Sequence, residues 1–383
     1  MEINLSAIID LRKHLHKNPE RSDQEKQTAL AVKAYINQFE PDEIVENIGG
    51  YGIAFIFKGK KEGASVLFRC ELDALPINEV NPFAHRSLRS DISHKCGHDG
   101  HMAIMCALAG VISDKRPETG RIILLFQPSE ENGQGAERVL NDPKFKTIVP
   151  DYVFALHNIP GYSKNTIIVK DNVFSSASIG ISIRLRGKTS HASEPENGQN
   201  PATAMANILK RTEKYFLPGE DPERVKLITP IYCKLGEQAF GTNPGNAEMM
   251  FTLRASHHDD FEQLKKYLIK TIHDSIDNFT PAGSLYMEYE WVEEFPNSEN
   301  DPNCNKIVLE SAQECQYPIE KLHFPFRWSE DFGHFLEKYP GAIFGIGAGI
   351  DHPALHNPDY DFPDDILETG IKMFYHIYKI ILS

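Results

Sequence analysis

The chain has 383 residues, which is long for one hydrophobic core and sufficient for two domains. Its 41% hydrophobic and 25% charged residues are typical of a globular protein, so the composition excludes a largely disordered chain. Lys and Arg number 40 against 54 Asp and Glu, a net charge of −14, and such an acidic surface repels nucleic-acid phosphates and anionic lipid. We therefore expect neither nucleic acid nor a membrane as a partner.

The sequence has neither a recognisable signal segment nor a membrane-spanning stretch, and this determines the expected cellular location. The start of the chain has no basic segment followed by an apolar core, and no stretch approaches 18 uninterrupted apolar residues. The six cysteines have no framework spacing and are expected to be reduced thiols; they stand at positions 70, 96, 106, 233, 304 and 315. These features predict a cytoplasmic protein.

The first part of the chain predicts an α/β sheet. The first 40 residues are predicted to be helical, and Ser22 followed by Glu25 has the spacing of a capping box at a helix start. A buried helix is expected at 101–112, and apolar runs predict strands at 52–59, 65–72, 121–128 and 151–158. Strands that alternate with helices favour a sheet covered by helices on both faces.

The pattern changes near residue 175, where a strand of period-two alternation begins. It is followed by a predicted helix at 200–216, strands at 226–234 and 247–255, a helix at 259–277 and a strand at 284–292. This order is that of a ferredoxin-like α+β sandwich. The α/β pattern then returns, with a helix at 303–316, a strand at 341–349 and a helix at 364–381. We therefore expect a discontinuous first domain, 1–174 with 297–383, and an inserted domain at 175–296.

Four polar clusters follow predicted strands or open the helix at 101, and none lies in the inserted domain. They are HKCGHDGH (94–101), QPSEENGQGA (127–136), ALHNIPG (155–161) and DHPALHNPDYDF (351–362). Sites in open α/β sheets gather at the carboxyl ends of strands. Imidazole, carboxylate and thiolate from separate loops are the donors of a catalytic zinc-type site. The clusters thus predict a metal centre in the first domain.

Each of these residues also has a simpler interpretation. Cys96 is equally typical of a small buried side chain, His157 of a core histidine, and Glu130 with Glu131 of solvated loop charges. A further alternative makes Cys96 a nucleophile that a neighbouring histidine activates, either His98 or His101. That alternative leaves the other clusters unexplained, and their conjunction favours a metal site.

Three more segments carry a family resemblance together with these clusters: RCELDALPI (69–77), RGKTSHASEPENGQNPATAM (186–205) and WSEDFGHF (328–335). The chain resembles the amidohydrolase branch of the M20 metallopeptidase family, which contains aminoacylases, hippurate hydrolases and indole-acetyl-amino-acid hydrolases. The motifs occur in family order from about residue 69 to 362. The ordered set is far more specific than any single motif.

The resemblance implies a zinc-peptidase-like catalytic domain with a mixed sheet covered by helices, and an inserted lid and dimerisation domain. It implies two divalent ions per chain (Zn, Mn, Ni or Co), with a bridging thiolate from Cys96 and further ligands His98, Glu131, His157 and His356. Glu130 matches the general base, and His191 matches a histidine that stabilises the oxyanion in its own subunit or its partner's. The implied enzyme is a homodimer that hydrolyses N-acyl-amino acids, related small amides or dipeptides.

Other roles stay open at this point. Asp73 and Asp99 are expected to orient metal ligands, and Arg254 either binds a substrate carboxylate or pairs with an acid on a sheet face. Two positions depart from the family pattern: Glu71 stands where Asp is usual, and Gly241 where Asn is usual. A non-catalytic binding homologue of the same fold is the alternative from another functional class.

Overall fold

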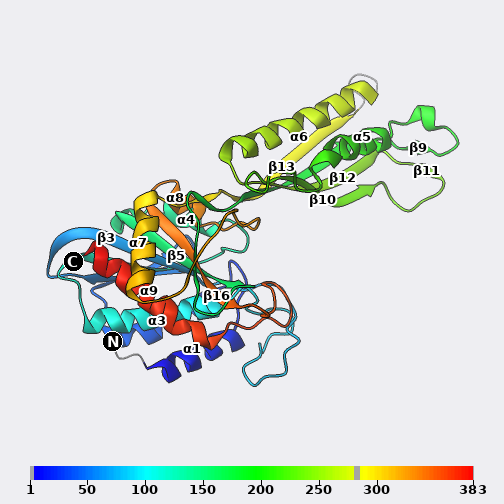
Figure 1. Cartoon of the computed structure of the whole chain (residues 1–383). Helices are drawn as coiled ribbons and strands as arrows, with labels where there is room; N and C mark the ends of the chain where they lie inside the picture. Colours follow the sequence, from blue (N-terminus) through cyan, green and yellow to red (C-terminus); the bar gives the residue numbers. More distant parts are fainter. Residues whose placement is uncertain (1–3, 280–284, 383) are drawn as a thin grey trace. The chain divides into compact units, whose positions relative to one another are not determined.

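The computed structural model describes residues 4–279 and 285–382, in which the chain forms two compact units (Figure 1). The first unit comprises Met1–Phe174, Ser298–His323 and Asp331–Ser383. The second comprises Ser175–Asn297 and Phe324–Glu330. Each unit has a sheet and a hydrophobic core of its own.

An eight-stranded mixed sheet in the order β1-β2-β4-β3-β5-β16-β6-β15 forms the centre of the first unit. Its strands are β1 Glu43–Ile48, β2 Gly52–Lys58, β3 Lys61–Glu71, β4 Thr119–Gln127, β5 Tyr152–Pro160, β6 Ile167–Val169, β15 Ile319–Lys321 and β16 Gly341–Gly349. A separate short pair joins β7 Val173–Ser175 and β14 Ser298–Glu299. The five strands predicted for this part of the chain are confirmed as β2, β3, β4, β5 and β16.

Helices cover both faces of this sheet, as the sequence predicts (Figure 1). They are α1 Leu5–Lys17, α2 Lys26–Ile36, α3 His98–Asp114, α4 Gly135–Asn141, α7 Pro302–Glu314, α8 Gly333–Leu336 and α9 Leu367–Ile381. The main core lies between the sheet and the longer helices α1, α2, α3, α7 and α9. The short helices α4 and α8 pack against each other and against β4 and β16. Helix α3 is buried along nearly all of its length, which explains its continuous apolar sequence.

The predicted capping box at the start of α2 is wrong. The backbone N–H of Thr28 donates to Oε2 of Glu20 at 2.7 Å, so Glu20 satisfies this helix end. Ser22 donates instead to Asp73, and Glu25 accepts from Ser129. The two residues have the capping spacing, but contacts with distant segments of the chain take both side chains away from the helix end.

The second unit is a four-stranded antiparallel sheet in the order β10-β12-β8-β13 with two helices packed on one face. Its elements are β8 Ala177–Arg186, α5 Ala202–Thr212, β10 Lys226–Leu235, β12 Asn246–Ala255, α6 His258–Phe279 and β13 Tyr286–Phe295. This order confirms the predicted ferredoxin-like sandwich; Ser284, where the last strand was expected to begin, lies outside the described residues. A two-stranded pair, β9 Ser190–His191 with β11 Thr242–Asn243, completes the unit.

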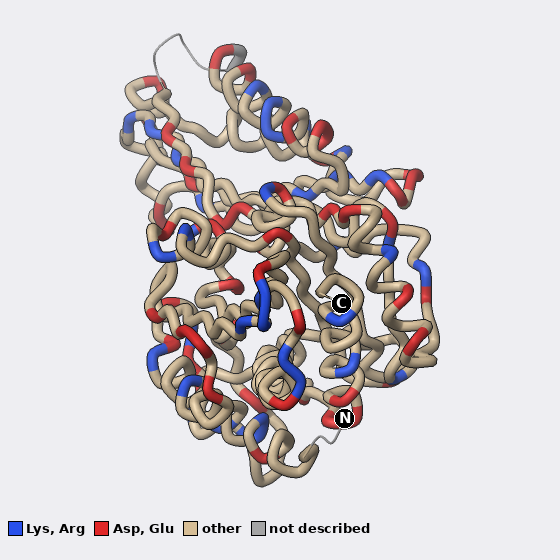
Figure 2. The backbone as a smooth tube through the Cα atoms, turned by 90° about the vertical axis from the view of Figure 1, so that its left-hand side faces the viewer, with Lys and Arg blue, Asp and Glu red and all other residues tan. Residues whose placement is uncertain are grey.

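Acidic and basic residues are interspersed along the backbone rather than separated (Figure 2). On α6, Lys270 pairs with Asp274 at 2.9 Å, and Arg211 of α5 pairs with the same carboxylate at 2.9 Å. Exposed pairs of this kind contribute little to stability. Each unit is therefore stabilised mainly by its own hydrophobic core. None of the helices in residues 4–279 and 285–382 is long and apolar enough to span a bilayer.

Candidate metal centre

The polar clusters meet at one edge of the eight-stranded sheet. Strand β3 is parallel to β4 and β5, and β5 is parallel to β16, so the carboxyl ends of these four strands point the same way. Asp73 follows the end of β3, Glu130 follows β4, His157 lies near the end of β5, and His356 lies in the loop after β16. Four segments that are distant in the sequence thereby supply polar side chains to one place.

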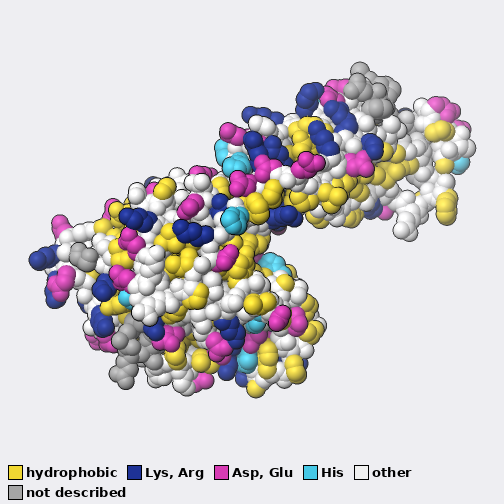
Figure 3. Space-filling model, in the orientation of Figure 1, with side chains coloured by type: hydrophobic (Ala, Val, Ile, Leu, Met, Phe, Trp, Pro, Cys, Tyr) yellow, Lys and Arg dark blue, Asp and Glu magenta, His cyan; other side chains and the backbone are white. Residues whose placement is uncertain are grey.

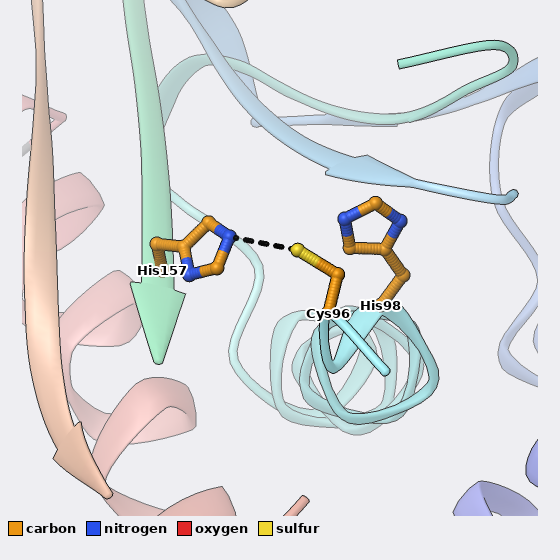
Figure 4. Close-up of side chains that lie close together, drawn as sticks. All are labelled: Cys96, His98 and His157. Atoms are coloured by element: carbon orange, nitrogen blue, oxygen red, sulfur yellow. Dashed lines mark hydrogen bonds between the residues drawn. The ribbon is translucent and has the colours of Figure 1, made fainter. Parts of the chain in front are cut away.

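The turn that begins α3 places Cys96 and His98. Gly97 between them has φ +97°, and a Cβ at this position would lie 2.6 Å from Oδ1 of Asn158, so the turn requires glycine. It directs Sγ of Cys96 toward Nε2 of His157 on β5, 3.5 Å away (Figure 4). A thiol and two imidazoles from two elements therefore share one buried position.

The two adjacent glutamates approach the same position from the loop after β4. Oε2 of Glu130 lies 3.8 Å and Oε1 of Glu131 lies 3.9 Å from Nε2 of His98. The other oxygen of Glu131 lies 3.9 Å from Nε2 of His356. The His356 side chain is 52% exposed whereas that of Glu131 is 11% exposed, so the cluster opens to solvent beside His356.

Among several groups of potential metal ligands in the described residues, two triplets overlap at Cys96. One triplet is Cys96, His98 and His157, and the other is Cys96, Glu131 and His356. Within each triplet the ligand atoms lie within 4.8 Å of one another. Cys96 therefore stands where a thiolate can serve two ions at once.

Backbone carbonyls orient the two buried histidines. Nδ1 of His98 donates to the carbonyl oxygen of Asp73 at 2.9 Å, and Nδ1 of His157 donates to that of Asn158 at 2.9 Å. Both rings then present Nε2 to the cluster, which is how histidine ligands are held for metal binding. Oδ1 of Asp73 also lies 3.5 Å from Nδ1 of His98, a position that favours the orienting role expected of Asp73.

An unsatisfied nitrogen shows that the cluster fits a metal ion. Nε2 of His98 is buried and has no hydrogen-bond partner among the residues that the structure describes. Buried polar atoms are nearly always paired, so an unpaired one that faces carboxylates and a thiol indicates a ligand position. Thiolate, imidazole and carboxylate are also the donors that zinc and related divalent ions take.

Burial sets the protonation states of the thiol and of the His157 ring. Burial raises the pKa of Cys96 well above its ordinary value, and the charge of Glu131 adds to this effect. Burial also lowers the pKa of His157 to about 3, with a further contribution from His101. Neutral imidazole is the form of His157 that binds metal, and without an ion the raised pKa keeps Cys96 in its thiol form. Either role of Cys96, ligand or nucleophile, requires the loss of this proton.

Asp99, which was expected to orient a ligand, lies in a separate buried network. Its Oδ2 accepts from Arg12 at 3.1 Å and lies 2.9 Å from Nδ1 of His16. His16 in turn lies 3.1 Å from Oε1 of Glu79. These contacts tie the first turn of α3 to α1, so the position of Asp99 favours support of the helix start over contact with a ligand.

The second unit holds the two remaining predicted site residues, His191 and Arg254. His191 is exposed on β9 and pairs with Thr242 of β11. Arg254 on β12 donates to the carbonyl oxygen of Arg327 at 3.1 Å and to Oγ of Ser329 at 2.9 Å. No carboxylate in residues 4–279 or 285–382 forms an ion pair with either side chain, so the acid partner considered for Arg254 is not found there.

Two residues that contact the site, Ser22 and Glu25, have the sequence spacing of a helix cap. Oγ of Ser22 donates to Oδ2 of Asp73 at 2.8 Å. Oε1 of Glu25 accepts from the backbone N–H of Ser129 at 2.8 Å, directly before Glu130, across a separation of 104 positions. A local pattern in one sequence carries no signal for a contact of that range.

Comparison with known proteins identifies one family, and the similar proteins include hydrolases. The model of peptidase family M20/M25/M40 matches residues 67–379. N-acetyl-L-cysteine deacetylase of Bacillus subtilis is 27% identical over 382 residues, covering 98% of this chain and 89% of the relative. Hippurate hydrolase of Campylobacter jejuni is 27% identical over 366 residues, covering 95% of this chain and 94% of the relative. The crystal structure of the B. subtilis YXEP protein, a dinuclear metal binding peptidase, has the same fold, with a TM-score of 0.84 at 22% identity and coverage of 99% and 98%.

Proposed function

Because this chain belongs to peptidase family M20/M25/M40 and is a hydrolase of its amidohydrolase branch, we propose that it hydrolyses the amide bond of N-acyl-amino acids or of related small amides and dipeptides. The observation that carries the proposal is the pair of overlapping ligand triplets around Cys96 with Glu130 beside them. The names of the two relatives, a deacetylase of N-acetyl-L-cysteine and a hippurate hydrolase, support this substrate class.

The donor set supports two divalent ions per chain. Cys96 would be shared between them, with His98 and His157 on one side and Glu131 and His356 on the other. A thiolate favours zinc over harder ions such as manganese, although Mn, Ni and Co also accept such mixed donors. When bound, the metal lowers the pKa of water to about 7 and polarises the amide carbonyl.

Glu130 is suited to the proton transfers of amide hydrolysis. Oε2 of Glu130 lies 3.8 Å from Nε2 of His98, and the two oxygens of its neighbour Glu131 lie 3.9 Å from Nε2 of His98 and 3.9 Å from Nε2 of His356. A carboxylate beside the donor set takes a proton from the attacking water and later delivers it to the leaving amine. We therefore assign the general base to Glu130 and a ligand role to Glu131.

Two residues of the second unit are suited to substrate binding. The backbone N–H of Ser193 donates to Nδ1 of His191 at 3.2 Å, so the neutral ring carries its proton on Nε2 and can donate to an oxyanion. Arg254 keeps a guanidinium that no described carboxylate neutralises, as recognition of a substrate carboxylate requires. We therefore propose that His191 stabilises the oxyanion and that Arg254 binds the substrate carboxylate.

The edges of the second unit's sheet support the expected homodimer. Strand β10 is an edge strand, and Ile231 is 60% exposed, beside exposed Tyr232 and, on β12, Met250. Figure 3 shows hydrophobic side chains gathered along this unit at the place where Figure 1 labels these strands. An apolar open edge is a template for pairing with another chain.

The oligomeric state is tested by sedimentation of the purified protein. The wild type should be a dimer, and Ile231→Asp should shift it toward monomer; a wild-type monomer would contradict this part of the proposal.

The enzyme proposal is tested with purified protein and a set of N-acetyl-, N-benzoyl- and dipeptide substrates. We expect two divalent ions per chain, loss of turnover on chelation and recovery on addition of Zn or Mn. Glu130→Gln should retain the metal and lose turnover. A protein that binds these compounds without hydrolysing any of them would instead support the non-catalytic homologue.

A further inference from the structure

The segment 22–25, between α1 and α2, contacts the loop that carries the two glutamates of the site. Oγ of Ser22 donates to Oδ2 of Asp73 at 2.8 Å, and the backbone N–H of Glu131 donates to the same oxygen at 3.0 Å. Oε1 of Glu25 accepts from the backbone N–H of Ser129 at 2.8 Å. One short segment thus holds the loop on both sides of Glu130.

Ser129 has a backbone conformation that requires such support. Its φ is +55°, in the left-handed region that L side chains other than Asn and Asp seldom adopt, and it directly precedes Glu130. The backbone N–H of Asp23 donates to its Oγ at 3.0 Å, in addition to the contact of its own N–H with Glu25. Backbone strain of this kind persists only where surrounding structure fixes it, and it tends to occur at functional sites.

The burial of the Glu25 carboxyl group is energetically unfavourable at this position. It is fully buried, its Oε2 has no hydrogen-bond partner, and no Lys, Arg or His of residues 4–279 and 285–382 forms an ion pair with it. Burial raises the pKa of Glu25 to about 7, and Asp73 adds to this effect. Helix capping does not explain why Glu25 is buried, because Glu20 caps α2. The burial of Glu25 instead allows its contact with the backbone N–H of Ser129.

We propose that Glu25 is a positioning residue of the active site, which fixes the backbone of Ser129 and thereby the direction in which Glu130 leaves the loop. The inference rests on the proposed function, because it takes Glu130 as the general base. Ser22 assists by sharing the oxygen of Asp73 with the amide of Glu131, so the same segment sets both carboxylates. Glu25 acts through Ser129 and is not itself assigned a contact with substrate or metal.

The kinetic test compares three variants. Glu25→Ala removes the acceptor and should lower kcat by about 10- to 100-fold with little change in KM, because misplacing a catalytic group by about 1 Å has an effect of this size. Glu25→Gln keeps an acceptor for the Ser129 amide and should recover most of kcat. The matched control is Glu20→Ala, which lies just before this segment; it removes the cap of α2 and should lower stability while leaving kcat unchanged.

A second readout does not depend on activity. Hydrogen exchange of the metal-free protein should be faster at the Ser129 amide in Glu25→Ala than in wild type, and unchanged there in Glu20→Ala. Should Glu25→Ala fail to fold, Glu25→Asp keeps the charge but is one methylene too short for the contact, and the same changes are expected.

The outcomes separate the two proposals. An active wild type with equal kcat in the Glu25 variants would overturn the positioning role and leave the proposed function intact. A wild type without hydrolase activity would defeat the proposed function; exchange then decides the role of Glu25, since an unaltered Ser129 amide overturns it and a faster one supports it.

Discussion

Nδ1 of His101 lies 2.6 Å from Oε2 of Glu71, and both side chains are buried next to His98 of the candidate metal centre. Nε2 of His101 lies 2.6 Å from Oδ1 of Asn158, whose backbone carbonyl holds the His157 ring. Arg69 pairs with the other oxygen of Glu71. A glutamate therefore reaches both a cation and a histidine, which gives a physical reason for its presence where the family usually has aspartate.

Glu71→Gln should destabilise the protein by roughly 3–5 kcal/mol, because it removes one charge from a buried ion pair. The measurement is the free energy of unfolding from urea titration of the metal-free protein. Glu62→Gln, at an exposed position of the same strand, is the control and should change little. A loss below about 1 kcal/mol for Glu71→Gln, typical of an exposed pair, would contradict the buried arrangement.

Cys96→Ser should lower both the metal content and the activity, because Cys96 belongs to both ligand triplets. Elemental analysis of the purified protein gives the number of ions per chain. Cys106→Ala removes another buried thiol, further along α3, and should retain the wild-type metal content. If Cys96→Ser lost activity but kept its metal, the nucleophile alternative would replace the ligand role.

The sequence is sufficient to predict which side chains of the candidate site lie close together at the ends of parallel strands. His157 and Glu131 were placed beside Cys96 because parallel strands deliver their carboxyl ends to one edge, and the structure brings them together there. The same local reasoning failed for Ser22 and Glu25. Their spacing is that of a cap, but the folded chain offers them partners far away in sequence, and a single sequence contains no information on that competition.

The network around Asp99 predicts a pH dependence of stability. Burial alone would lower the pKa of His16, but the charge of Asp99 and the hydrogen bonds that His16 donates to Asp99 and Glu79 outweigh it and raise the pKa to about 9 from an ordinary value of 6.5. A raised pKa means that protonated His16 stabilises the fold fully below pH 6.5, and that this contribution is lost as the pH rises through about 9.

His16→Gln should therefore be less stable than wild type by roughly 3 kcal/mol near pH 6, with the difference shrinking toward pH 10. Urea unfolding at several pH values measures it. His14→Gln, at an exposed position of the same helix, should show no such trend. A difference that grows as the pH rises would contradict the sign of the predicted linkage.

Arg254 should determine recognition of the substrate carboxylate. Burial lowers the pKa of Arg254, and the guanidinium donates to a carbonyl and a hydroxyl, so its charge is available to a ligand anion. Arg254→Ala should reduce kcat/KM for an N-acyl-amino acid by about 100-fold, because a desolvated charge pair contributes about 2–5 kcal/mol. The same variant should hardly affect the corresponding carboxamide, which offers no negative charge. Arg184→Ala, an exposed arginine on β8 of the same sheet, is the matched control. Equal losses on the acid and the carboxamide would show that Arg254 supports the fold of the second unit and does not select the substrate.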